Sequence, residues 1–167
     1  MYRALVIFPM VIAAALAATG CGRSPAANNQ AVDLKYHLAD EPADAVEILD
    51  AKEQAKDGEA VVVVGRVGGG MKPWIDGRAA FLLVDTRILP TCNEGEKCDE
   101  NCPSCAEAML SASTMVKFLG TDGKVVPVDA RDLLGVKEQQ TVVVRGVANR
   151  DKAGNVTIAG EKIYVRR

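Results

Sequence analysis

Two runs of valine, each broken by a single glycine, constrain the fold of this chain more than any other feature. They read VVVVGRV at 61–67 and VVVRGV at 142–147. Residues branched at Cβ favour extended backbone on a pleated, half-buried surface, and a glycine inside a strand marks a bulge or a sharp bend. Valine stays frequent, with 17 in the 109 residues from Glu59 onward. This part of the chain therefore predicts a mainly β domain whose strands bend sharply.

Apolar segments bounded by turn residues supply the remaining elements. The predicted strands cover 60–67, 79–85, 114–119 with a hairpin partner at 124–128, 141–147 and 156–165. Asp122-Gly123 provides the hairpin turn. A short helix is predicted over 130–134 and ends at Gly135. A longer surface helix is predicted over 40–56, with Asp40 as its cap.

The resulting order is three strands, a short helix and two strands, with a glycine bend in the first and fourth strands. A small barrel needs such bends so that one strand can pair on both of its edges. This pattern resembles the OB-fold, a five-stranded Greek-key barrel, over residues 60–167. We therefore expect one domain over 39–167, an OB-fold-like barrel with an N-terminal surface helix. A generic β-sandwich is the alternative.

The first 21 residues have the parts of an export signal followed by a cysteine. A short basic start leads into 14 apolar residues at 4–17, fewer than the ~20 that a membrane-spanning helix needs. Ala18-Thr19-Gly20-Cys21 then resembles the lipobox of bacterial lipoproteins. The resemblance implies a signal peptide over 1–20, cleavage before Cys21, and acyl chains, palmitate among them, on Cys21. The alternatives are an ordinary secretory signal with a chance cysteine and a transmembrane anchor.

Residues 21–38 are predicted to link the lipid to the domain. The segment begins with small and polar residues, which is typical of a flexible tether. Gly22 follows the cysteine, where an aspartate would suggest retention at the inner membrane, so an outer-membrane address is favoured. We expect a protein of the bacterial cell envelope that faces the periplasm, with the membrane as its partner through the lipid anchor.

Four of the five cysteines fall in a predicted insertion, 90–111, between the second and third strands. They are Cys92, Cys98, Cys102 and Cys105, spaced C-x5-C-x3-C-x2-C. In the oxidising space outside the cytoplasm we expect two disulfides, whose pairing the spacing leaves open. A tetrathiolate zinc site is the second interpretation. Thiol–disulfide exchange at the C-x-x-C pair Cys102 and Cys105 is the third.

Charge and aromatic content argue against nucleic acid as a partner. The net charge is −2 and aromatic residues make up 4% of the chain, whereas single-strand binders need a basic groove and stacked aromatics. Trp74, Arg66 and Arg78 are the candidate binding residues, in or beside the connection between the first two strands, which can line the binding face of an OB-fold. The alternative for Trp74 is a loop anchor packed over a barrel end.

The chain has one histidine, His37, which lies before the predicted barrel. A single histidine in this position excludes Ser–His and Cys–His catalysis, and we predict no enzyme activity and no cofactor. The predicted role is non-enzymatic binding or scaffolding of an envelope protein or a small ligand. The alternative is a zinc-binding or thiol-redox envelope protein that uses the four-cysteine segment.

Overall fold

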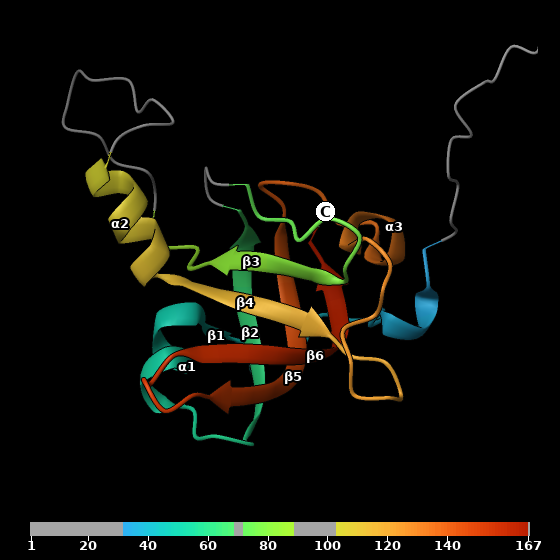
Figure 1. Ribbon diagram of the computed structural model, residues 1–167, viewed down its shortest axis with the longest axis horizontal. Coiled ribbons are helices and arrows are strands. Elements are labelled where there is room, and N and C mark those ends of the chain that lie inside the picture. Colours follow the sequence, from blue (N-terminus) through green and yellow to red (C-terminus); the bar gives the residue numbers. More distant parts are fainter. Residues whose placement is uncertain (1–31, 69–71, 89–102, 167) are drawn as a thin grey trace, which may run out of the picture.

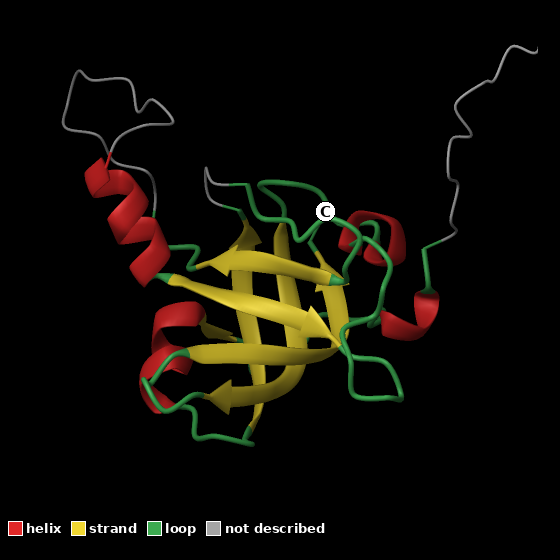
Figure 2. Cartoon of the chain, viewed as in Figure 1, coloured by secondary structure: helices red, strands yellow, loops and turns green. Residues whose placement is uncertain are grey.

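The computed structural model describes residues 32–68, 72–88 and 103–166 (Figure 1). The described elements, in chain order, are the 3-10 helix η1 (Leu34–Tyr36), β1 (Val46–Glu47), α1 (Ile48–Gln54), β2 (Ala60–Val67), β3 (Ala80–Val84), α2 (Pro103–Ser111), β4 (Ser113–Phe118), α3 (Ala130–Leu134), β5 (Thr141–Arg150) and β6 (Val156–Val165). Figure 2 shows the strands at the centre of the molecule and the short helices around them.

Strand β2 closes a barrel because it pairs on both edges. Its antiparallel ladder with β5 runs from Ala60↔Val147 to Arg66↔Thr141, and its end pairs with β3 at Arg66↔Val84. β3 pairs with β4, β4 lies parallel to β6, and β6 pairs with β5. The barrel order is therefore β2-β3-β4-β6-β5, with β1 added at the edge of β2. The predicted OB-fold-like Greek-key barrel is confirmed, and the sandwich alternative is wrong.

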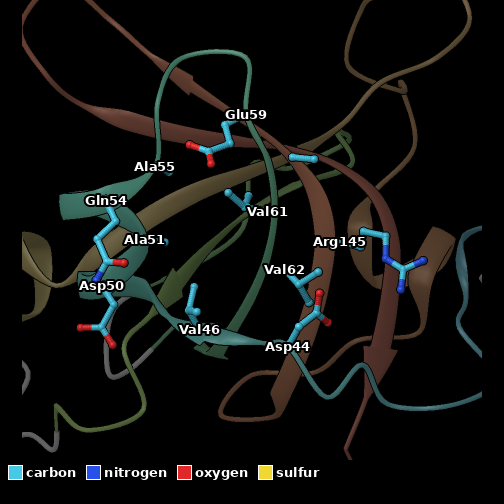
Figure 3. Close-up of a pocket in the computed structure, with 11 residues that line it drawn as sticks. Asp44, Val46, Asp50, Ala51, Gln54, Ala55, Glu59, Val61, Val62 and Arg145 are labelled. Carbon is cyan, nitrogen blue, oxygen red and sulfur yellow. The ribbon is translucent and has the colours of Figure 1, made fainter.

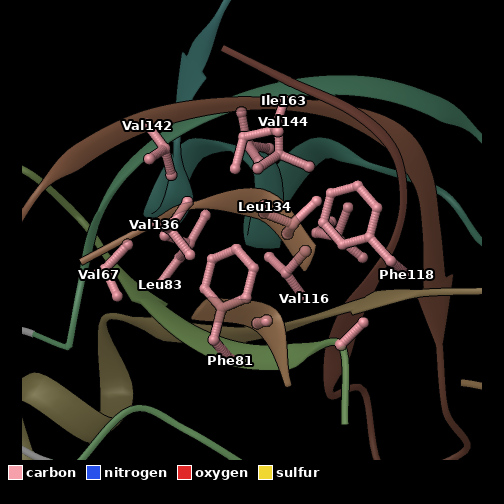
Figure 4. Close-up of a cluster of buried hydrophobic side chains, with 14 of the residues drawn as sticks. Val67, Phe81, Leu83, Val116, Phe118, Leu134, Val136, Val142, Val144 and Ile163 are labelled. Carbon is pink, nitrogen blue, oxygen red and sulfur yellow. The ribbon is translucent and has the colours of Figure 1, made fainter. Parts of the chain in front are cut away.

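Apolar side chains from all five barrel strands fill the interior (Figure 4). Phe81 stacks on Phe118 with ring centroids 6.4 Å apart, and Tyr36 meets the edge of Phe118 at 5.4 Å. Leu134 of α3 and Ile48 of α1 belong to the same buried cluster. Because these side chains occupy the interior, we expect a binding site on the surface of the barrel.

The glycines that interrupt the two valine runs, Gly65 and Gly146, have different structural roles. At Gly146 the ladder between β5 and β6 shifts register, which is the predicted bulge. The ladder through Gly65 keeps its register. A Cβ at Gly65 would lie 3.2 Å from Leu83 Cβ and 3.3 Å from Ile48 Cγ1. Gly65 therefore permits close packing of β2 against β3 and α1, rather than a bulge.

The helix predicted over 40–56 is present only over Ile48–Gln54. Helix α1 begins only at Ile48, after Glu47 as N-cap with an extended ψ of 158°. Val46 and Glu47 form β1 instead, and pair in parallel with Val63 and Val64 of β2. This pairing places backbone groups of β1 in the sheet, and a tertiary contact of this kind overrides a helical sequence pattern.

Two strand boundaries also differ from prediction. Segment 124–128 forms only the single bridge Leu119↔Val125, because Pro127 has no N–H to donate to a ladder. The turn before it is present, with Gly123 at φ 71°. β5 continues past 147 to Arg150, which pairs with Val156 of β6.

Residues 33–38, predicted as the end of the tether, pack against the barrel. Tyr36 is buried, and the Leu38 N–H donates to the Ile163 carbonyl at 2.8 Å. The predicted signal peptide, Cys21 and the tether as far as residue 31 lie outside the described residues. Within 32–68, 72–88 and 103–166, no helix is long and apolar enough to cross a membrane.

Candidate functional site

Trp74 anchors the connection between β2 and β3. Its indole N–H donates to Glu138 Oε1 at 2.8 Å, and its ring lies against Phe81 with centroids 6.1 Å apart. The Arg131 guanidinium lies over the ring, 5.4 Å from its centroid. The residue is 7% exposed. This geometry is that of the loop anchor, and ligand binding by Trp74 stays a prediction.

Arg66 and Arg78 make contacts that differ from those of Trp74. Arg66 donates from Nη2 to the Ile88 carbonyl at 2.7 Å, just before the four-cysteine segment. Its Nε is buried with no hydrogen-bond partner in the described part of the chain. Arg78 is exposed, and its carbonyl accepts from the Ala130 N–H. Binding by either arginine stays a prediction.

The predicted sulfur sites lie largely beyond the description. Cys21, Cys92, Cys98 and Cys102 are outside the described residues, and Cys105 lies on α2 with its side chain outside the description. Among the residues that are described, no group of three or more His, Cys, Asp or Glu side chains is placed to hold a metal ion. Disulfides, zinc binding and thiol exchange all stay predictions.

Helix α1 holds both ends of the four-cysteine segment. Before the segment, at the end of β3, the Asp85 carboxylate accepts from the Leu49 N–H at 2.9 Å. At the end of the segment, where β4 begins, Lys52 Nζ donates to the carbonyls of Ser111 and Ser113, the second at 3.0 Å. The chain therefore leaves β3 and enters β4 at positions set by one helix.

Asp85 is the buried centre of this contact. Burial favours its neutral form, but hydrogen bonds from Arg87 and from the Leu49 N–H outweigh burial and hold the pKa of Asp85 below its usual value. Arg87 donates from Nε to Oδ1 and from Nη2 to Oδ2, both at 2.9 Å. It also pairs with Asp50 at 3.1 Å. The charges of this network are already paired, so the network supports the fold.

A groove of about 430 Å³ lies between α1 and the first half of β2 (Figure 3). Asp50 and Gln54 project from the α1 side, and Val62 lies on the β2 side. Its apolar lining consists of Val46, Ala51, Ala55, Ala60, Val61 and Val62. Val46 is 42% exposed, so this lining offers apolar surface to a ligand.

The charged lining of the groove is mostly acidic. It consists of Asp44, Asp50 and Glu59, against the single cation Arg145. Asp50 pairs with Arg87. Neither Asp44 nor Glu59 forms an ion pair with another described residue. An apolar groove with excess negative charge suits a ligand that is partly apolar and cationic.

A second, more polar hollow lies beside η1 and the end of β6. Its lining includes His37, Glu41, Tyr164 and Arg166. Arg166 pairs with Glu41 at 2.6 Å, which uses the opposite charges of this hollow on each other. This hollow is the larger of the two, at about 830 Å³. The groove on α1 is nevertheless the better candidate, because it combines exposed apolar surface with two acids that form no ion pair with another described residue.

Sequence reasoning missed the groove. The groove exists because the chain runs along β2 as β1 and then turns into α1, whereas a continuous helix was predicted there. A usable signal was present in two small residues at helical spacing, Ala51 on α1 and Ala55 at its C-cap. Such residues let a helix approach a strand closely, but they do not reveal which strand.

Sequence comparison finds no matching family model and no matching curated protein. Solved structures that show a distant likeness include two examples. The hypothetical protein ygiW from E. coli is 15% identical, with 75% of this chain and 94% of that chain covered and a TM-score of 0.38. An OBody bound to hen egg-white lysozyme is 14% identical, with 78% of this chain and 98% of that chain covered and a TM-score of 0.40. The fold assignment depends on the strand pairings, and likeness at this level leaves the function open.

Proposed function

We propose that this chain is a lipid-anchored protein of the bacterial cell envelope that binds a partner and has no catalytic activity. The groove between α1 and β2 is the observation that carries the binding role. The barrel interior is filled with apolar side chains, and the charges of the Asp85 network are paired. The groove combines exposed apolar surface with two acids, Asp44 and Glu59, whose charge is free for a ligand.

The anchor is supported by the lipobox-like Ala18-Thr19-Gly20-Cys21. Two or three acyl chains hold a protein on a membrane firmly, whereas one holds it marginally. The tether would end where the Asp33 N–H donates to the Leu133 carbonyl at 2.9 Å. A flexible tether over 22–32 has a root-mean-square span of about 20 Å. The barrel would then work close to the membrane surface.

The anchor is tested by fractionating cells that make the wild-type chain, Cys21→Ser or Ser24→Ala. We expect the wild type and Ser24→Ala in the membrane fraction and Cys21→Ser released from it, because serine offers no thiol for acylation. Metabolic labelling with palmitate should mark the first two proteins alone. Membrane retention of Cys21→Ser would remove the proposed anchor.

The binding role is tested in the same cells with a photoreactive residue at Gln54 or at Glu53. Gln54 lines the groove, and Glu53 is exposed on the same helix outside that lining. We expect a discrete covalent adduct from position 54 and none from position 53. No adduct from position 54, or equal adducts from both positions, would remove the groove as the binding site.

A further inference from the structure

The first half of β2 has a ladder partner on one edge alone. β5 pairs with β2 from Ala60 to Arg66. On the opposite edge, β1 pairs only with Val63 and Val64, and β3 only with Arg66 and Val67. Within the described ranges, no strand pairs with Ala60–Val62 on that edge, and this is the edge that lines the groove.

The register shows which backbone groups turn toward the groove. The Glu59 carbonyl accepts from the Ala148 N–H, one position before the first pair of the β2–β5 ladder. The Val67 N–H donates to the Gln140 carbonyl, one position after its last pair. Odd-numbered residues of β2 therefore direct their N–H and C=O groups toward β5. Because these groups alternate along a strand, Ala60 directs its N–H and C=O, and Val62 its N–H, toward the groove. The Val62 carbonyl faces the Val46 N–H in the parallel pairing of β1 with β2. From the Ala60 N–H to the Val62 N–H, this open edge spans about 7 Å at ~3.3 Å per residue.

The side chains around this edge favour a particular ligand. Val61 and Val62 place apolar surface beside it, and Asp44 and Glu59 add negative charge. Glu59 Oε2 accepts from the Lys56 N–H at 2.7 Å, which fixes this carboxylate at one end of the groove (Figure 3). A strand that pairs with β2 would gain main-chain hydrogen bonds from the edge and specificity from the side chains.

We propose that the groove binds an extended peptide segment of a partner, with alternating basic and apolar side chains, as an added strand on β2. Its backbone pairs with Ala60 and with the Val62 N–H. Its apolar side chains contact the valine that lies on their own face of the sheet, and its lysines or arginines lie near Asp44 and Glu59. This inference deepens the proposed binding function and rests on it. It names the ligand class that the same groove takes.

The test measures binding of a fluorescent heptapeptide of alternating lysine and valine, with blocked ends, to the full lipidated protein in detergent. Fluorescence anisotropy gives the Kd. Replacing each lysine with glutamate should abolish binding. Methylating the backbone nitrogens on the edge of the peptide that faces β2 should weaken binding about fivefold, because it removes the hydrogen bond to the Ala60 carbonyl, about 1 kcal/mol. Peptides that bind alike despite these changes would overturn the proposal.

The protein side is tested with Asp44→Asn combined with Glu59→Gln, which keeps an amide oxygen for the Lys56 N–H. We expect affinity for the lysine peptide to fall about five- to tenfold through the loss of two charge pairs. The matched control removes two exposed acids outside the groove lining, Glu53→Gln and Glu107→Gln, and should change Kd less than about twofold at 0.15 M salt. Equal losses in both double variants would overturn the proposal.

Failure of this inference is distinguishable from failure of the proposed function. If the lysine peptide does not bind but adducts still form at position 54 in cells, the ligand class is wrong and the binding role stands. If the adduct is a second copy of this chain, and the peptide does not compete with it, the groove serves self-association and the peptide proposal falls.

Discussion

Gly146 is a position where the barrel has no room for a side chain. A Cβ there would overlap the Ala159 carbonyl oxygen and would lie 2.9 Å from Gly160 Cα. Both obstacles are backbone of β6, which cannot move without disturbing its ladder to β5. The glycine is required because two strands approach closely at the bulge.

We expect Gly146→Ala to lower the free energy of unfolding by about 1–3 kcal/mol, the usual cost of overpacking, as measured by urea denaturation. Gly120→Ala is the control. Its added Cβ would meet an oxygen of the Asp122 side chain at 3.0 Å, with the nearest backbone atom at 3.7 Å, and we expect a change below about 1 kcal/mol. Wild-type stability of Gly146→Ala would show that the bulge tolerates a side chain.

At the scale of elements, α3 is so short that its end contacts decide its stability. The Asp129 side chain caps it by accepting from the Arg131 N–H at 3.0 Å, and it also accepts from the Gly77 N–H at 3.2 Å. Arg131 Nε donates to the same carboxylate at 2.7 Å. The hydrogen bond from Arg131 is the main reason that the pKa of Asp129 falls to about 2.

The lowered pKa of Asp129 predicts that the free energy of unfolding depends on pH. A carboxylate with a folded pKa of about 2, against 3.8 for the unfolded chain, stabilises the fold above about pH 4. That contribution is lost as pH falls from about 4 toward 2. We expect Asp129→Asn to cost on the order of 1–2 kcal/mol at neutral pH. The cost should shrink toward zero near pH 2, as measured by urea denaturation across the pH range.

Arg131→Gln is the matched variant for this prediction. It removes the guanidinium that lowers the pKa of Asp129 and keeps the Arg131 backbone N–H as the cap donor. The stability difference between the wild type and Arg131→Gln should therefore show the same pH dependence. A cost of Asp129→Asn that stays constant from pH 6 to pH 2 would contradict the assignment.

At the scale of the whole molecule, the contacts of α1 position the ends of the four-cysteine segment, and the proposed export would set the redox environment of its thiols. The segment leaves β3 and enters β4 at points that Asp85 and Lys52 hold on α1. In an exported protein, its thiols would mature in an oxidising compartment. Bridges that close short loops between fixed ends reduce the entropy of the unfolded chain. We therefore expect Cys92, Cys98, Cys102 and Cys105 in two disulfides.

Mass spectrometry of protein purified from the envelope without reductant tests this expectation. Two disulfides predict a mass lower than that of the reduced protein by four hydrogen atoms. One zinc per chain, with four free thiols after chelation, would favour the metal alternative. Insulin reduction that is lost in Cys102→Ser would favour thiol exchange.

Local patterns were enough to place several elements. Strand β2 at 60–67, strand β6 at 156–165 and helix α3 at 130–134 match the predicted bounds. Each has a strong local signal, either β-branched residues between turns or a cap and a terminal glycine. The helix predicted over 40–56 is shorter in the structure because Val46 and Glu47 pair with β2, and a window of sequence contains no information about that partner. The groove was missed for the same reason.

The sequence by itself determined that this chain would build a bent β-barrel, because β-branching and glycine act through the local backbone. It also determined the lipobox-like start and the cysteine spacing, which are features of the chain and not of its folding. Only the tertiary structure decided that β2 leaves an edge open beside α1, that Trp74 serves as an anchor, and that Asp44 and Glu59 line one groove. These depend on contacts between distant segments, whose geometry is set when the barrel closes.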